Sequence, residues 1–265
     1  MNIQLRRYLN GQWSNSEQDI VTIEEPLEIR VQGRPTAVTM RTPGHDIELV
    51  LGFLCTEGVI DGRDDVYAIA HVDDPSDVQR NTVDAVLSGG VPMARTHKAD
   101  RRLFATSSCG ICGKESIDRI IQTGLTVEPI AMPDPSLICN LPEALRSAQN
   151  AFAQTGGIHA AGLFTLDGNC LVVREDVGRH NAVDKVIGYA LENDIFPCRK
   201  AILVLSGRAG FELIQKAAMA QIPLVVAIGA PSSLAVTLAQ QLGMGLIGFT
   251  KSNRFNVYSE SKNVS

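Results

Sequence analysis

From about residue 155 onward, short apolar stretches alternate with amphipathic ones, and this alternation constrains the fold more than any other feature. The stretches "AILVLSG", "IPLVVAIGA" and "GLIGFT" are nearly continuous in apolar residues, as is typical of strands buried on both faces of a sheet. Between and before them, "RHNAVDKVIGYALEN", "FELIQKAAMA" and "SSLAVTLAQQLG" have the apolar spacing of helices. With further strands at "HAAGLFTL" and "CLVVRED", the pattern predicts a layered α/β domain whose last strand is "GLIGFT".

The first hundred residues have a different character and predict a smaller, strand-rich lobe. "QDIVTIEEPLEIRVQGRPTAVTMRTP" alternates apolar and polar residues around a Gly-Arg-Pro turn, which indicates antiparallel strands. A helix should follow, with Thr42 as its cap, Pro43 in its first turn and Gly58 at its end. We therefore expect three parts: an amino-terminal lobe over residues 1–105, a Cys-x-x-Cys loop with a following helix over 106–130, and an α/β domain over 131–265.

Charge and hydropathy narrow the classes of partner. The chain has 24 basic and 29 acidic residues, a formal net charge of −5, which offers no overall attraction to nucleic acid or to an anionic membrane. The amino-terminal stretch lacks the apolar region of a signal peptide, and the longest apolar stretches are too short to span a bilayer. We expect a cytoplasmic protein with no nucleic-acid or membrane partner, in which the six cysteines are reduced.

Two cysteines lie three positions apart in "SSCGICGKES", residues 107–116. The start of the predicted helix "KESIDRIIQTGL" and the charge of Lys114 should both favour the thiolate forms of Cys109 and Cys112. A zinc site would need three or four ligands, yet no second Cys-x-x-Cys and no preceding His-x-Glu occur, so we expect no metal. The spacing alone remains compatible with a redox dithiol and with a sulfur carrier.

Three polar motifs follow predicted strands and precede helices or the chain end, where backbone N–H groups and arginine side chains can receive an anion. Their members of interest are Asp176, Gly178, Arg179, His180, Asp184 and Lys185 in "REDVGRHNAVDK", Ser206, Gly207 and Arg208 in "SGRAGFE", and Lys251 and Arg254 in "FTKSNR". Because ligands of open α/β sheets bind at the carboxyl ends of strands, these loops should converge on one site for a phosphorylated ligand. His159 and His180 are further candidates, as proton donors or as groups that orient a phosphate.

Taken in order, these motifs resemble the FdhD-type formate dehydrogenase accessory sulfurtransferases. The resemblance extends over nearly the whole chain, in "EEPLEIRVQG", "MRTPGHDIELVLGFLCTEGVI", "CGICGKESID", "TGGIHAAGLF", "EDVGRHNAVDKVIG", "SGRAGFELIQKAA", "APSSLAVTLAQ" and "LIGFTKSNRFNVY". It implies a cytidine-deaminase-like α/β fold, with residues 131–265 as the cofactor-binding domain, and a homodimer.

The resemblance also implies a function. A cysteine desulfurase would supply persulfide sulfur to Cys109, supported by Cys112, and the sulfur would pass to the molybdenum or tungsten bis-guanine-dinucleotide cofactor that formate dehydrogenase requires. GDP should bind as a surrogate for the cofactor's guanine dinucleotide ends. The expected cofactor-binding residues are Phe249, Thr250, Lys251, Ser252, Asn253, Arg254, Ser206, Gly207, Arg208 and His180. A dithiol oxidoreductase and a non-catalytic chaperone of formate dehydrogenase are the alternatives.

Overall fold

The computed structural model describes residues 1–73, 79–92, 95 and 125–262 of the chain. Cys109, Cys112 and the helix predicted to follow them lie outside the described residues. The larger of the sheets has six strands in the order β10-β9-β11-β12-β13-β14. Its strands are β9 (His159–Thr165), β10 (Cys170–Asp176), β11 (Ala201–Leu205), β12 (Leu224–Ala227), β13 (Gly245–Lys251) and β14 (Arg254–Ser259).

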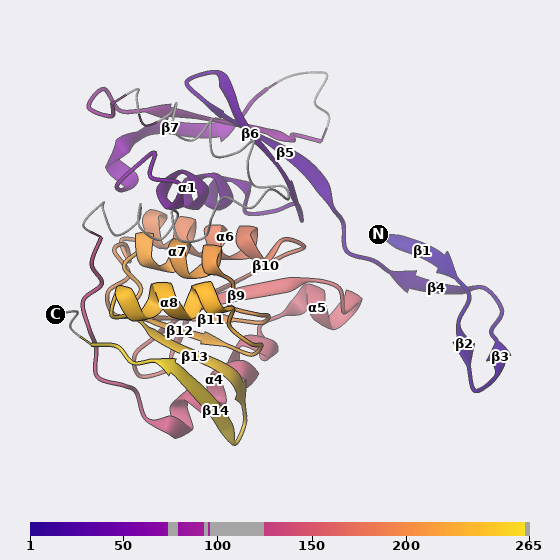
Figure 1. The fold of residues 1–265 in the computed structure, drawn as a ribbon. Coiled ribbons are helices and arrows are strands. Elements are labelled where there is room, and N and C mark those ends of the chain that lie inside the picture. Colours follow the sequence, from indigo (N-terminus) through magenta and orange to yellow (C-terminus); the bar gives the residue numbers. More distant parts are fainter. Residues whose placement is uncertain (74–78, 93–94, 96–124, 263–265) are drawn as a thin grey trace.

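Helices cover both faces of this sheet (Figure 1). On one face lie α6 (Arg179–Glu192), α7 (Phe211–Met219) and α8 (Ser233–Gln241), and on the other lies α4 (Pro135–Ser147), followed by the short α5 (Asn150–Thr155). The alternation within β11 reflects this arrangement, because Leu203 and Leu205 belong to the apolar core on the α6–α8 side, whereas Ile202 and Val204 belong to the core under α4. The predicted layered α/β domain is confirmed, and so are the positions of its predicted helices and strands up to β13.

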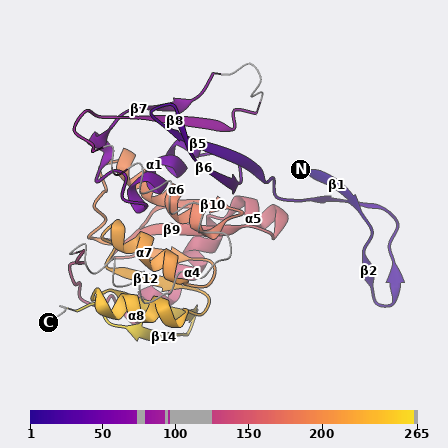
Figure 2. The same ribbon diagram turned by 45° about the horizontal axis from the view of Figure 1, so that its top comes forward.

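A second, four-stranded sheet in the order β6-β5-β8-β7 is built from the amino-terminal part of the chain. Its strands are β5 (Glu25–Val31), β6 (Arg34–Arg41), β7 (Val66–His71) and β8 (Thr82–Leu87), with the 3₁₀ turn η1 (Arg63–Asp65) before β7. The helix α1 (Asp46–Thr56) lies between this sheet and α6, as Figures 1 and 2 both show. One continuous apolar core joins the four-stranded sheet, α1, α6 and the larger sheet. The three-part division predicted from the sequence stays a prediction.

The contact between α1 and α6 depends on two glycines. A Cβ atom at Gly52 would lie 1.8 Å from the carbonyl oxygen of Asp184, and one at Gly188 would lie 1.8 Å from that of Glu48. No side chain fits at either place, so the two helix backbones approach as closely as they do because both positions are glycine.

Local predictions failed at three places. The hairpin between β5 and β6 turns at Gln32–Gly33, both with positive φ as in a type I′ turn, and Arg34 is already in β6. The helix α1 begins at Asp46 with His45 as its N-cap residue, and the Thr42 hydroxyl accepts a hydrogen bond from the Val177 N–H (3.1 Å). "GLIGFT" is not the last strand, since β14 pairs with β13 in a hairpin that closes at Lys251 and Arg254.

The first twenty residues form an arm that extends away from the rest of the protein in both views (Figures 1 and 2). It consists of two short ladders, one between β1 (Asn2–Leu5) and β4 (Glu17–Ile20), the other between β2 (Tyr8–Leu9) and β3 (Gln12–Trp13). Tyr8 and Trp13 pack on each other at its tip, with ring centroids 5.1 Å apart. Among the described residues, no helix has both the length and the apolar character needed to cross a membrane.

Candidate functional site

The ends of several strands meet at one edge of the large sheet. Because β9 runs antiparallel to β11, its first residue, His159, lies at the same edge as Ser206, which follows the last residue of β11. The Ser206 hydroxyl accepts a hydrogen bond from the Ala160 N–H (2.8 Å), and the Ser206 N–H donates to the Ala160 carbonyl (3.0 Å). This reciprocal pair fixes the start of the loop after β11 beside His159.

The loops after β11 and β12 are bonded to each other. The Gly229 N–H donates to the Gly207 carbonyl at 2.9 Å, and a Cβ atom at Gly229 would lie at the same distance from that oxygen. The Ala209 N–H in turn donates to the Ala230 carbonyl at 3.2 Å. The segment from Ser206 to Ala209 is therefore held by main-chain hydrogen bonds to the loop after β12.

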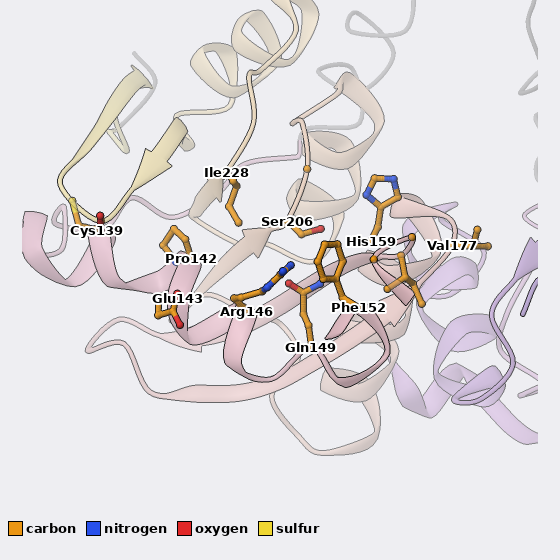
Figure 3. A pocket seen from close by; sticks show the side chains of 15 residues that line it. Cys139, Pro142, Glu143, Arg146, Gln149, Phe152, His159, Val177, Ser206 and Ile228 are labelled. Carbon is orange, nitrogen blue, oxygen red and sulfur yellow. The ribbon is translucent and has the colours of Figure 1, made fainter. Parts of the chain in front are cut away.

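A cavity of about 720 Å³ opens beside these loops (Figure 3). This volume lies within the range of small-molecule sites in proteins, roughly 300–1,000 Å³. The residues that line it are Cys139, Pro142, Glu143, Arg146, Gln149, Phe152, Gly156, Gly157, Ile158, His159, Val177, Ser206, Gly207, Ile228 and Ser252. The cavity therefore lies between the strand ends and the helices α4 and α5.

The wall that α4 and α5 contribute was not expected from the sequence. Its signals are nevertheless local: Asp134 accepts a hydrogen bond from the Ser136 N–H as an N-cap, and Pro135 occupies the first turn. Ile138, Leu141 and Leu145 then repeat at helical spacing and are buried under the large sheet. The helix could have been found from these residues, but the sequence does not show that Cys139, Pro142 and Arg146, next to this buried side, line a cavity at the strand ends.

Of the residues expected to bind a cofactor, Ser206, Gly207 and Ser252 line this cavity. Arg208 follows Gly207 and is exposed. His180, near the start of α6, is partly exposed and lies outside the cavity lining, where its Nε2 is 2.6 Å from a carboxylate oxygen of Glu212.

The remaining expected residues lie along the β13–β14 hairpin. Phe249 has a positive φ of 53°, next to a register shift, and its side chain is 44% exposed. The Thr250 hydroxyl is buried and donates to the Ala227 carbonyl at 3.0 Å, so it is already used inside the protein. Lys251, Asn253 and Arg254 are exposed at the hairpin end. The roles of all ten residues in cofactor binding stay predictions.

His159 is the titratable ring of the cavity wall. Burial lowers its pKa, and the charges of Arg179 and His180 lower it further, against an opposing effect of Asp176. The hydrogen bond from His180 lowers the pKa of Glu212, so that carboxyl stays ionised to more acidic pH than usual. In its neutral form, the His159 imidazole can accept or donate a hydrogen bond but adds no positive charge to the site.

Three charged residues of "REDVGRHNAVDK", Asp176, Asp184 and Lys185, are buried and paired inside the protein, whereas Arg179 is exposed and His180 partly exposed. Asp176 is fully buried, pairs with Lys185 (2.7 Å) and accepts hydrogen bonds from Thr42 and Gly178. Asp184 is buried between Lys216 (2.9 Å) and the Thr56 hydroxyl (2.8 Å). These pairs connect α6 to α7 and to the amino-terminal layer.

In the parts of the chain that the structure describes, no group of three or more His, Cys, Asp or Glu side chains is placed to hold a metal ion. Since Cys109 and Cys112 lie outside those parts, the expectation of no metal stays a prediction.

The fold and the cavity define a class: an α/β protein with helices on both faces of its large sheet and a cavity of ligand size at one edge of that sheet. The model of the FdhD/NarQ family matches residues 22–265, and the chain belongs to this family.

Similar proteins include three named sulfur carrier protein FdhD. That of Corynebacterium efficiens is 50% identical over 92% of this chain and 91% of its own. That of Streptomyces coelicolor is 46% identical over 93% and 89%, and that of Mycobacterium tuberculosis 44% identical over 98% and 96%.

The crystal structure of a putative formate dehydrogenase accessory protein from Desulfotalea psychrophila aligns with 100% of this chain and 99% of its own. The TM-score is 0.75 at 23% sequence identity, so this likeness shows the shared fold.

Proposed function

We propose that this protein is a sulfur carrier that serves the maturation of formate dehydrogenase. The observation that carries the proposal is its similarity, over more than nine-tenths of the chain, to relatives named sulfur carrier protein FdhD. The Cys-x-x-Cys motif of this chain supplies the chemical group that such a function needs. The transfer is an enzymatic step, with a cysteine persulfide as the intermediate.

The loading step is a displacement at sulfur. The Cys109 thiolate attacks the terminal sulfur of a persulfide on a cysteine desulfurase; a new S–S bond forms at Cys109, the donor's S–S bond breaks, and the donor cysteine leaves as a thiolate. Cys112 assists the onward transfer or closes a disulfide with Cys109 when no acceptor is present. Because this chemistry needs free thiols, it suits the reducing cytoplasm, where we place the protein.

The substrate that receives the sulfur is the molybdenum or tungsten bis-guanine-dinucleotide cofactor of formate dehydrogenase. The cavity at the strand ends supports this part of the proposal. So do the exposed cationic side chains of Arg208, Lys251 and Arg254, which are one or two positions along the chain from the lining residues Gly207 and Ser252. GDP is the surrogate ligand. The mixed sheet with helices on both faces is compatible with a cytidine-deaminase-like fold, which we propose together with a homodimeric state.

Mass spectrometry after incubation with a cysteine desulfurase and cysteine tests the function. The wild-type protein should gain one sulfur atom on Cys109, Cys109→Ala should gain none, and Cys112→Ala should still load Cys109 while losing the internal disulfide. Formate dehydrogenase matured with Cys109→Ala should be assembled but inactive.

The outcomes separate the alternatives. Loading of Cys112 at the wild-type rate in Cys109→Ala would reverse the two cysteine roles. An active formate dehydrogenase with both cysteines replaced would instead support a non-catalytic chaperone. Reduction of insulin disulfides without any sulfur transfer would support a dithiol oxidoreductase.

A further inference from the structure

The arm over residues 1–20 is a ribbon that lies outside the apolar cores. In both views it leads away from the rest of the protein, and none of its residues belongs to either core of the described chain (Figures 1 and 2). An isolated two-stranded ribbon is at best marginally stable in water. A surface on another molecule would therefore stabilise the arm where the body of this chain does not.

The outer end of the arm, which we call the tip, exposes three large side chains. Tyr8, Leu9 and Trp13 are 58%, 66% and 64% exposed. The Trp13 ring packs on Tyr8, and the Arg6 guanidinium lies 5.4 Å from the centroid of the Trp13 ring. Aromatic residues and arginine are enriched in protein–protein interfaces. The tip therefore has the composition of a surface that contacts another protein.

The base of the arm, which we call the root, has a second exposed apolar surface. The Met1 amino group donates to the Val21 carbonyl (2.9 Å), which closes the arm just before the chain enters β5. At the start of β5, Pro26 lies opposite Met40 of β6, so the end of β6 is beside the root. The exposed apolar side chains of the root are Ile20 (40%), Ile23 (45%), Val38 (66%) and Met40 (47%).

The tip and the root suit each other in one arrangement of two copies. A two-fold axis repeats every contact, so two arms that lie antiparallel set the tip of each on the root of the other. Arg6 and Arg7 are exposed beside the tip and Glu24 is exposed at the root, so this arrangement brings opposite charges together. Parallel arms would instead set the arginines of one tip against those of the other.

The exposed apolar area is large enough for a stable dimer. At about 150–250 Å² for a large side chain, the seven apolar side chains of tip and root expose on the order of 700 Å² on each subunit. An interface of standard size buries roughly 800 Å² per partner, somewhat over half of it apolar. Both halves of such an interface are therefore present on one chain, as an isologous dimer requires.

We propose that two copies of this chain dimerise through their arms, with the tip of each (Tyr8, Leu9 and Trp13) packed on the root of the other. The proposal rests on the homodimeric state proposed above, and goes beyond it by assigning the contact to the arm. It does not involve the sulfur-transfer chemistry.

Sedimentation equilibrium at several protein concentrations tests the arm contact. The wild type should be a dimer, and deletion of residues 1–20 or Trp13→Ser should weaken the dimer at least tenfold, about 1.4 kcal/mol. Met40→Lys places a charge in the root and should weaken it likewise. The matched control is Tyr67→Lys, because Tyr67 is 81% exposed on β7, at the opposite edge of the same sheet from β6. This variant should dimerise as the wild type does.

Mixing two weakened variants tests whether the tip meets the root. Equimolar Trp13→Ser and Met40→Lys chains should associate more tightly together than either does alone. The mixed dimer keeps one intact contact and places both substitutions in the other, whereas each variant alone has a substitution in both contacts. Trp13 is the only tryptophan of the chain, so its fluorescence reports on the tip directly. The emission of the wild type should shift to longer wavelength when dilution separates the subunits.

Four outcomes would overturn the arm contact. A dimer of wild-type affinity after deletion of the arm would assign the homodimer to another surface, and a wild type that is monomeric at every concentration would exclude the homodimer as well. No gain on mixing the two variants would contradict the packing of tip on root. A Trp13 emission shift only on addition of anionic phospholipid vesicles would make the tip a membrane contact. Persulfide loading of Cys109, measured on the same samples, distinguishes these outcomes from failure of the sulfur-carrier function.

Discussion

At the scale of the residue, the motif "REDVGRHNAVDK" contributes charged side chains both to the surface and to the interior. His180 is partly exposed and pairs with Glu212, whereas Asp176 and Lys185 form a buried pair at 2.7 Å. Removal of one partner of a buried pair typically costs about 3–5 kcal/mol, because the other charge is left uncompensated. Loss of function on substitution of these buried residues therefore needs a folding control before it is assigned to ligand binding.

His159 makes stability depend on pH in a defined direction. Burial lowers its pKa in the folded protein, so between that value and the ordinary value near 6.5 the unfolded chain binds more protons. The free energy of unfolding of the wild type should therefore fall as the pH decreases below about 6.5.

In His159→Asn this contribution is absent, and the stability difference between the two proteins should shrink toward acidic pH. The change should stay well below the about 1.4 kcal/mol per pH unit of a full proton, since His159 is only partly buried and solvent screens it. Urea unfolding at several pH values between 5 and 8 measures this difference. Parallel stability curves for the two proteins would contradict the prediction.

At the scale of the element, the packing of α1 on α6 sets how the two sheets are joined. The carbonyls of Glu48 and Asp184 occupy the space that side chains at Gly188 and Gly52 would need. Beside this contact, Arg174 of β10 forms an ion pair with Glu48 (2.5 Å), and Arg174 together with His45 lowers the pKa of that carboxyl despite its burial. The close backbone contact therefore joins α1 to α6, and the partly buried ion pair joins α1 to β10.

Gly188→Ala should lower the free energy of unfolding by about 1–3 kcal/mol, because the new methyl group would have to push the helices apart. A decrease in the free energy of unfolding would be informative, because alanine in a helix interior is ordinarily more favourable than glycine by roughly 1 kcal/mol. Urea denaturation followed by circular dichroism measures the effect.

The matched control is Gly62→Ala, where a Cβ atom would have no neighbour within 4 Å. Its stability should differ from that of the wild type by less than about 0.5 kcal/mol. A Gly188→Ala protein as stable as the control would mean that the helices do not meet as closely as described.

At the scale of the whole molecule, the body and the arm differ in what holds them. One apolar core extends from the four-stranded sheet through α1 and α6 to the large sheet, which should make the body unfold as a unit. The arm over residues 1–20 contributes no residue to either core, and Tyr8 and Trp13 are 58% and 64% exposed. The family match also begins only at residue 22.

Deletion of residues 1–20 should therefore leave the free energy of unfolding of the separate subunit unchanged within about 1 kcal/mol, as for other surface changes outside a core. Circular dichroism during urea denaturation measures it, and light scattering of both forms shows whether the arm affects the oligomeric state. A loss of several kcal/mol in a protein that remains the same oligomer would show that the arm packs on the body.

The sequence by itself determined the elements whose signals are local. The large layer was predicted correctly from the continuous apolar runs of β11, β12 and β13 and the periodic apolar faces of α6, α7 and α8. A strand buried on both faces has a continuous apolar run, whereas a helix buried on one face has apolar residues at helical spacing. The ordered motifs likewise indicated the family that the comparison confirmed.

Only the tertiary structure decided which polar residues line the cavity and which are buried. Thr42 had the properties of a helix cap, but it is bonded to Val177, far along the chain, and Asp184 and Lys185 had the properties of a binding motif but are buried. The α4–α5 wall became visible only when the fold brought α4 under the strand ends. The physical reason is that hydrogen-bond satisfaction and burial depend on neighbours distant in sequence, whereas periodicity depends on the chain's own repeat.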